Sequence, residues 1–245
     1  MVGYPYRYPQ KIEDALPEDI ESIITGIIGE GVSATYNATL GGWIGSLESL
    51  EASYGYWFIS NDDIDFSFNG CDEVDCWNLD QSISRQIRKQ SDVPIEYEYN
   101  QSINQAFYFF DNIEGIKEGD LIIAYNNNEV IGSRQWDGYI IDIPVMGNDG
   151  SIKTKNYIMD GFIPKFKLFH DGKITELQGD IPSWENNSIF IVPSISKVPN
   201  LPTEYSFEEA YPNPFNPITT LNFTIPKRDY MELKVYNTKG REIYI

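Results

Sequence analysis

Five aspartates in the middle of the chain have the side chains and surroundings that a hard cation could use. They lie mostly in predicted turns beside glycine, and they are Asp120, Asp137, Asp142, Asp149 and Asp160. Calcium takes carboxylate and carbonyl oxygens from loops of this kind. No segment has the spacing of an EF-hand loop, and Asn148-Asp-Gly150 is by itself typical of an ordinary turn. Calcium is therefore a possible cofactor, and a metal site is not assigned to any residue.

Residues for catalysis are harder to find. Pairs of acids could serve a glycosidase, but such pairs are expected by chance in a chain with 37 Asp and Glu. The only histidine, His170, falls at the tip of a predicted hairpin with no recognisable base or nucleophile as partner, which is typical of a solvated turn residue. No GxSxG, HExxH, P-loop or GxGxxG segment occurs. The sequence therefore predicts no catalytic residue and no enzyme.

Four residues are the best candidates for binding a ligand. Trp136, Asp137, Tyr139 and Trp184 fall in loop-like stretches flanked by glycine or proline. Exposed aromatic rings beside acid and amide groups suit stacking against sugars. The alternative is that these aromatic side chains close the ends of a β-sandwich.

The two cysteines, Cys71 and Cys76, are separated by four residues. This spacing allows a small disulfide loop, with free thiols as the alternative. Zinc would need two further ligands, and a redox dithiol usually has the spacing CxxC.

The elements around these residues are predicted to be mainly strands. Between residues 96 and 195, buried-type or alternating runs cover 106–110, 121–125, 130–131, 166–169, 174–177 and 188–192. Asn126-Asn-Asn-Glu129 and His170-Asp-Gly-Lys173 are predicted hairpin turns, the second of type I′. Strands with turns about every ten residues favour a β-sandwich domain over 96–195.

Residues 1–69 are predicted to form a small α+β module. Pro17 suits the first turn of a helix, and Ile20, Ile23, Ile24 and Ile27 repeat at helical spacing before Gly29 and Gly31. Strands are expected at 32–36 and 55–60, and another around Phe66 and Phe68. Polar residues 70–95 and Pro-rich residues 196–209 are interpreted as linkers.

The C-terminal segment 210–245 begins with the run YPNPFNPI, from Tyr211 to Ile218. Three prolines exclude a helix or a central strand, so we expect a rigid, extended entry around a buried Phe215. Strands are predicted at 219–226, with Leu221, Phe223 and Ile225 on one face, at 231–236 and at 241–245. A turn is predicted at 237–240.

Residues 209–226 and 233–243, including KVYNTKGREI, together resemble the type A sorting domain of the type IX secretion system. The resemblance covers roughly the last forty residues, and its motif comprises Tyr211, Pro212, Asn213, Pro214, Phe215, Asn216 and Pro217. It implies a partial immunoglobulin-like β-sandwich that addresses proteins across the bacterial outer membrane. Ile218 and Asn237 stand where the family more often has Thr and Asp, and the chain stops at Ile245, about midway through the family's sandwich.

The upstream segments are similar to β-rich modules of exported bacterial proteins. The segments VGYPY and GWIGSLESLEASYGYWF of the N-terminal module resemble a recurrent accessory module. The segments QAFYFFDNI and EGDLIIAYNNNEVIGSRQWDG resemble an uncharacterised β-domain that precedes sorting domains.

Composition and charge narrow the classes of partner. A hydrophobic content of 41% argues against general disorder, and a formal charge of −19 argues against binding nucleic acid or anionic membranes. No apolar run is long enough to span a membrane, and Met1-Val-Gly-Tyr-Pro5 does not resemble a signal peptide. Because an export module is expected to accompany a signal, we interpret the chain as a fragment cut at both ends.

These observations predict a non-catalytic, modular protein that is secreted or displayed on the cell surface. Its partners would be the secretion machinery of the outer membrane and, for the upstream modules, polysaccharide or cell-surface components. The alternative is the carbohydrate-binding C-terminal region of a larger secreted hydrolase.

Overall fold

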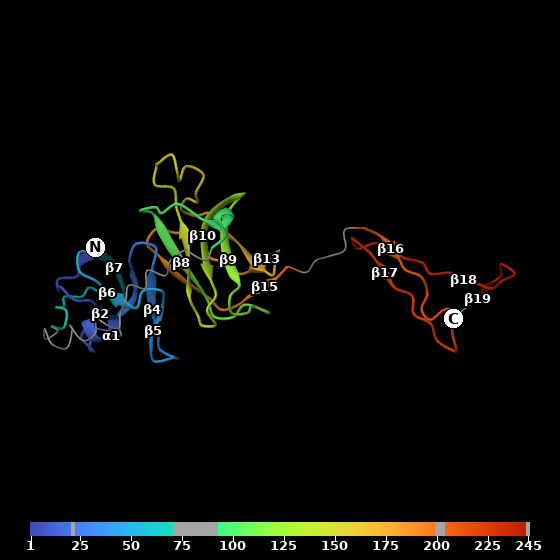
Figure 1. Cartoon of the computed structure of the whole chain (residues 1–245), viewed down its shortest axis with the longest axis horizontal. Helices are drawn as coiled ribbons and strands as arrows, with labels where there is room; N and C mark the ends of the chain where they lie inside the picture. Colours follow the sequence, from blue (N-terminus) through green and yellow to red (C-terminus); the bar gives the residue numbers. More distant parts are fainter. Residues whose placement is uncertain (21–22, 71–92, 199–203, 244–245) are drawn as a thin grey trace. The chain divides into compact units, whose positions relative to one another are not determined.

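The structure, a computed structural model, describes residues 1–20, 23–70, 93–198 and 204–243. The chain divides into two compact units, Met1–Val198 and Pro199–Ile245 (Figure 1). The first unit contains both the predicted N-terminal module and the predicted central domain. The predicted mainly β fold is confirmed, and both units are built from antiparallel sheets with one parallel strand pair.

The N-terminal module of the first unit contains eight short elements. These are β1 (Val2–Gly3), β2 (Gln10–Lys11), α1 (Ile12–Ala15), β3 (Ile24–Ile28), β4 (Ser33–Asn37), β5 (Gly42–Gly45), β6 (Ser49–Leu50) and β7 (Gly55–Ser60). Five of the strands form a sheet in the order β1-β7-β3-β4-β5, and β2 pairs with β6. The expected strands at 32–36 and 55–60 are confirmed as β4 and β7.

The predicted helix beginning at Pro17 is wrong, because Ile24–Ile28 is the central strand β3. Ile24 and Ile27 face one core of the module, whereas Ile28 faces another. A strand that is buried on both faces needs apolar side chains at successive positions, so its spacing overlaps that of an amphipathic helix. β-branched isoleucine favours the strand, and the central Gly26 disfavours a helix.

The strand expected around Phe66 and Phe68 is also absent from the described residues, which run irregularly from Asn61 to Gly70. Their rings nevertheless pack edge-on at a centroid distance of 5.2 Å and lie against the core of the module. Phe66 and Phe68 alternate because both rings contact the core of the module, although this segment does not pair with another strand.

The central domain is a β-sandwich, as predicted. Its elements are η2 (Ile95–Tyr97), β8 (Gln105–Phe110), β9 (Leu121–Asn126), β10 (Glu129–Gln135), β11 (Asp142–Met146), β12 (Lys165–His170), β13 (Lys173–Gly179), β14 (Ile189–Val192) and β15 (Ile195–Lys197). A five-stranded sheet β10-β9-β12-β13-β15 packs on a three-stranded sheet β11-β8-β14. Both predicted hairpins form, with positive φ at Asn127 in one turn and at Asp171 and Gly172 in the other.

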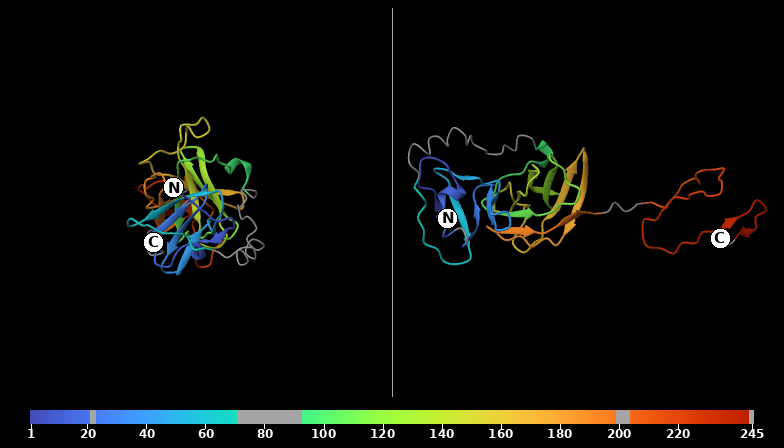
Figure 2. Two further views of the ribbon diagram at one scale, coloured as in Figure 1. Left: turned by 90° about the vertical axis from the view of Figure 1, so that its left-hand side faces the viewer. Right: turned by 90° about the horizontal axis from the view of Figure 1, so that it is seen from below.

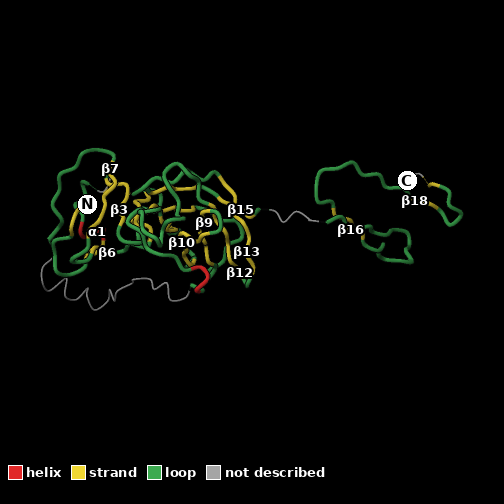
Figure 3. The backbone as a smooth tube through the Cα atoms, turned by 90° about the horizontal axis from the view of Figure 1, so that it is seen from above, coloured by secondary structure: helices red, strands yellow, loops and turns green. Residues whose placement is uncertain are grey.

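Strand β8 is buried on both faces and makes the first unit three layers deep (Figures 2 and 3). Tyr108 and Phe110 point into the sandwich core. Phe107 and Phe109 point the other way and pack with Ile28 of the N-terminal sheet. The apolar run of β8 therefore belongs to a middle layer, and the N-terminal module is the third layer of the same unit. The sequence predicted two separate domains here, whereas the structure packs them against each other in one unit.

The second unit has little regular structure and is drawn mostly as loop in Figure 3. It contains two two-stranded sheets, formed by β16 (Ser206–Phe207) with β17 (Phe223–Thr224) and by β18 (Val235–Tyr236) with β19 (Glu242–Ile243). None of residues 204–243 is buried. Of the predicted strands 219–226 and 231–236 only two residues each pair, as do Glu242–Ile243 of 241–245, whose last two residues lie outside the described part; no sandwich core forms among residues 204–243.

Candidate functional site

The sorting-motif residues form a loop that closes on itself. The backbone N–H of Tyr211 donates to the carbonyl of Thr220 at 3.1 Å, and Thr220 returns a bond to Tyr211 at 3.0 Å. The hydroxyl of Thr219 donates to the carbonyl of Pro212. The expected extended entry is therefore wrong: proline excludes these residues from a ladder, and the chain folds back between the two ends of the motif.

The side chains of this loop are open to solvent. Tyr211 is 81% exposed, Phe215 58% and Ile218 74%. The expectation that Phe215 is buried is wrong, because no sheet of the second unit has a second layer to cover it. The loop presents large apolar groups outward, as a recognition surface would require.

The predicted turn at 237–240 forms and is held by one side chain. The N–H groups of Lys239 and Arg241 donate to Oδ1 of Asn237, at 3.0 and 2.9 Å. Gly240 has a φ of +74° and donates to the carbonyl of Asn237. Asn237 thus supplies the acceptor that fixes this turn, a role that the short side chains of Asn and Asp both suit.

The four predicted binding residues do not form one surface. Trp136 and Trp184 were expected to be exposed, but they are only 9% and 2% exposed and belong to the sandwich core. The indole N–H of Trp184 donates to the carbonyl of Val145 at 2.9 Å, which satisfies its polar atom inside the protein.

Of the same four residues, only Tyr139 has a widely exposed ring, at 78%. Its backbone N–H donates to Oδ1 of Asp137, so the acid stabilises the loop. The predicted sugar-stacking platform of several rings is therefore wrong, and the alternative in which tryptophans close the sandwich describes Trp136 and Trp184.

The five aspartates considered for calcium have separate partners in the protein. Asp149 accepts hydrogen bonds from Ser151 and Thr154, which lower the pKa of its carboxyl group, and Asp160 accepts one from Asn186. Across residues 1–20, 23–70, 93–198 and 204–243, no group of three His, Cys, Asp or Glu side chains could hold a metal ion. Cys71 and Cys76, the predicted disulfide pair, lie outside the described residues.

His170 has carboxylate partners that the sequence did not indicate. Its Nδ1 lies against Oδ1 of Asp120, which is itself buried, and its Nε2 lies 3.2 Å from Oδ2 of Asp171. The expected solvated turn residue is therefore wrong: the ring links the end of β12 to the turn before β9. The contact crosses 50 residues of sequence, so local spacing carried no signal for it.

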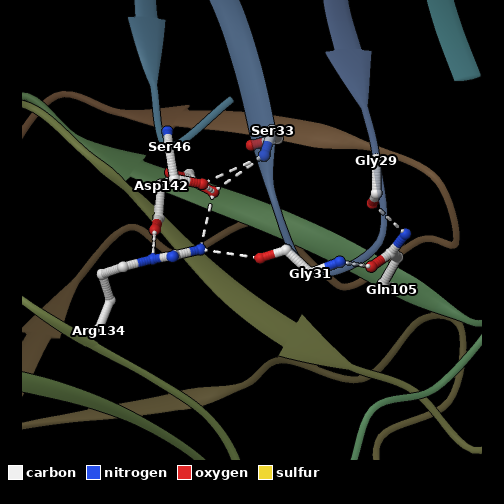
Figure 4. Close-up of polar contacts among 7 residues, drawn as sticks. All are labelled: Gly29, Gly31, Ser33, Ser46, Gln105, Arg134 and Asp142. Atoms are coloured by element: carbon white, nitrogen blue, oxygen red, sulfur yellow. Dashed lines mark hydrogen bonds and ion pairs between the residues drawn. The ribbon is translucent and has the colours of Figure 1, made fainter. Parts of the chain in front are cut away.

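A buried polar cluster joins the N-terminal sheet to the sandwich (Figure 4). Asp142, at the start of β11, has no solvent exposure. Its Oδ1 accepts from the backbone N–H of Ser46 at 2.7 Å, and its Oδ2 accepts from the N–H of Ser33 at 3.1 Å and from the hydroxyl of Ser46 at 2.8 Å. The donors come from Ser33 in β4 and from Ser46, which follows β5, so two segments of the N-terminal module bind one carboxylate of the sandwich.

Arg134 completes this cluster from the end of β10. Its Nη2 lies 3.1 Å from Oδ2 of Asp142 and donates to the carbonyl of Gly31 at 3.0 Å, while its Nε donates to the carbonyl of Asp142. Beside it, the amide of Gln105 donates to Gly29 and accepts from Gly31 (Figure 4). Burial raises the pKa of Asp142, while Arg134 and Ser46 act in the opposite direction.

Both carboxylate oxygens of Asp142 are buried and accept hydrogen bonds from the protein, so the cluster holds the layers together. No helix of the described residues is long and apolar enough to cross a membrane.

Comparison of the chain with protein-family models, with curated proteins and with solved structures finds no match.

Proposed function

We propose that this chain is a non-catalytic protein exported to the cell exterior, with a type IX secretion address in its second unit. In this proposal the first unit is an extracellular accessory or adhesive module, and its partners are the secretion machinery and a surface or polysaccharide ligand. The observation that carries the proposal is the ordered pair of motifs, Tyr211–Pro217 followed by KVYNTKGREI, in one unit.

Accessibility supports this role. An address has to be bound by another protein, and the motif loop exposes Tyr211, Phe215 and Ile218 to solvent. The turn motif is likewise exposed and is fixed by Asn237. Both motifs also lie outside the compact first unit, so a receptor can bind them without unfolding the three-layered sheets.

The arrangement of polar groups in the first unit supports a binding role over a catalytic one. The buried acid Asp142 is used between layers, and Asp120 is used by His170. The first unit therefore offers a rigid scaffold with surface loops.

Export of the full chain tests the proposal. The chain, preceded by a signal peptide, is expressed in a bacterium that uses type IX secretion and in a derivative that lacks the machinery. We expect it in the medium or on the cell surface in the first strain and in the periplasm in the second, by fractionation and immunoblotting.

A matched pair of substitutions locates the signal. Phe215→Ser changes the motif loop, whereas Phe207→Ser changes a phenylalanine of the same unit that is 65% exposed and lies outside the motif. We expect only Phe215→Ser to accumulate in the periplasm. Retention of the unchanged chain in the periplasm of the competent strain would contradict the proposal.

A further inference from the structure

A groove lies at the edge of the sandwich where β13, β14 and β15 meet. It has a volume of about 460 Å³ and is lined by the turn between β14 and β15, the end of β13 and the segment that follows β8. The predicted binding residues Trp136, Tyr139 and Trp184 are not part of it. In Figure 1, β13 and β15 mark this edge of the first unit.

The backbone around the groove is fixed by hydrogen bonds between distant segments. The N–H of Asp111 donates to the carbonyl of Val192, and the N–H of Ile195 donates to the carbonyl of Asn112. Gly179 also lies so close to the carbonyl oxygen of Ser194 that a Cβ would approach it at 2.9 Å. The walls are therefore preformed, which lowers the entropy lost when a ligand binds.

Six polar side chains around this groove have no side-chain partner among the residues that the structure describes. Within the described parts of the chain, none of them takes part in a side-chain hydrogen bond or ion pair; they are Asn112, Glu114, Gln178, Asp180, Ser194 and Ser196. The aspartates Asp120, Asp142, Asp149 and Asp160 all have such partners. The groove thus concentrates amide, hydroxyl and carboxylate groups that are available to a ligand.

The chemistry of the lining selects the class of ligand. Two carboxylates and no lysine or arginine line the groove, in a chain with a net charge of −19, so an anionic ligand would be repelled. Pro193 adds an exposed apolar group, while Val192 and Ile195 behind it are buried in the sandwich core. The hydroxyl groups of a neutral sugar both donate and accept hydrogen bonds, and its C–H faces are apolar. Such a ligand therefore matches a lining that combines polar and apolar groups.

We propose that this groove binds a neutral oligosaccharide, with roughly two sugar rings inside it. Glu114 and Asp180 accept hydrogen bonds from sugar hydroxyls, and Asn112 and Gln178 both donate and accept. This inference rests on the extracellular binding role proposed for the first unit, and it adds the ligand class and the site.

Binding is tested with the purified full chain by isothermal titration calorimetry. The probes are cellohexaose, xylohexaose and mannohexaose, with polygalacturonate as an anionic comparison. We expect at least one neutral hexasaccharide to bind, and the double substitution Glu114→Gln with Gln178→Ala to weaken that binding at least ten-fold. These side chains are exposed, so circular dichroism should show an unchanged fold.

Two control substitutions separate the groove from other sites. Glu129→Gln changes an exposed acid in the hairpin between β9 and β10, and Tyr139→Ala removes the exposed ring predicted from sequence. Both should leave the affinity unchanged. Loss of binding on Tyr139→Ala alone, binding of polygalacturonate only, or no binding of any neutral probe would overturn the inference. Because purified protein is used, these outcomes are independent of the export assay.

Discussion

Asp142 is a fully buried carboxylate whose donors come from both parts of the first unit. Ser33 and Ser46 belong to the N-terminal module, and Arg134 belongs to the sandwich. A buried ion pair is weak evidence for stability on its own, but removing one partner leaves the other charge uncompensated. The Asp142 cluster fixes the orientation of the N-terminal sheet, because Ser33 and Ser46 can both reach the carboxylate in only one placement of that sheet.

We predict that Asp142→Asn lowers the free energy of unfolding by about 1–3 kcal/mol, because the amide nitrogen of asparagine cannot accept the hydrogen bonds that Ser33, Ser46 and Arg134 donate to this buried side chain. Chemical denaturation measures the change. The control is Lys11→Gln, which removes an exposed ion pair with Glu13 and should change stability by less than about 1 kcal/mol. Equal effects of the two substitutions would contradict the role of the buried cluster.

The pH dependence of stability follows from the raised pKa of Asp142. A carboxyl group with a higher pKa in the folded protein binds its proton more tightly there, so it stabilises the fold below its unfolded pKa. That contribution is lost as the pH rises through the folded pKa. We therefore expect the stability advantage of the unchanged protein over Asp142→Asn to shrink as the pH rises from about 4. An advantage that grows over this range would show that Arg134 and Ser46 outweigh burial.

Strands β10 and β11 show how one element constrains another. A Cβ on Gly132 would overlap the carbonyl oxygen of Pro144, since β10 and β11 approach closely at this corner of the sandwich. The register of β10 against β9 also shifts between Val130 and Gly132. Gly132 thus lets β10 bend towards the other sheet.

We predict that Gly132→Ala destabilises the protein by about 1–3 kcal/mol or more, because the added methyl group meets backbone that cannot move aside. Thermal unfolding followed by circular dichroism measures the shift. Gly42→Ala is the matched control, since a Cβ on Gly42 has no atom within 4 Å, and its melting temperature should stay close to that of the unchanged protein. A neutral Gly132→Ala would mean that the two strands are further apart than described.

At the scale of the whole molecule, the N-terminal module covers one face of the three-stranded sheet. Phe107 and Phe109 have no exposure, and Ile189 packs with them against Ile28 of β3. A Cβ on Gly26 would lie 2.6 Å from the Cδ1 of Ile189, which shows how closely the layers approach. The first unit therefore behaves as one folded body, while most of the predicted linker 70–95 lies outside the described residues.

We predict that deletion of residues 1–69 makes the remaining chain self-associate, because the deletion exposes Phe107, Phe109 and Ile189. Sedimentation velocity measures the oligomeric state. In the truncated chain, Phe107→Ser combined with Phe109→Ser should restore the monomer if circular dichroism still reports β structure. A truncated chain that stays monomeric without these substitutions would show that the two parts fold independently.

Charge is divided unevenly between the two units. Residues 199–245 contain six acidic and five basic side chains, so nearly all of the net charge of −19 belongs to the first unit. The negative charge therefore favours solubility of the first unit and repels anionic ligands from it. In the proposed export role, the nearly neutral second unit would meet its receptor without strong electrostatic repulsion.

The sequence by itself determined the mainly β class, most strands of the sandwich and both hairpin turns. These features depend on neighbouring residues: alternation or apolar runs in β8 and β9, and Asp171-Gly172 in a turn that needs positive φ. It also supplied the sorting motif, whose function remains a proposal.

Only the tertiary structure decided which surfaces meet. The isoleucines of β3 have helical spacing in the sequence because β3 is buried on both faces, and Trp136 and Trp184 have loop-like neighbours although they lie in the core. Ser33 and Asp142 are 109 residues apart, and the groove combines three segments that are distant in the chain. Local periodicity reports the conformation of a segment, whereas burial and hydrogen-bond partners depend on which layer packs against it.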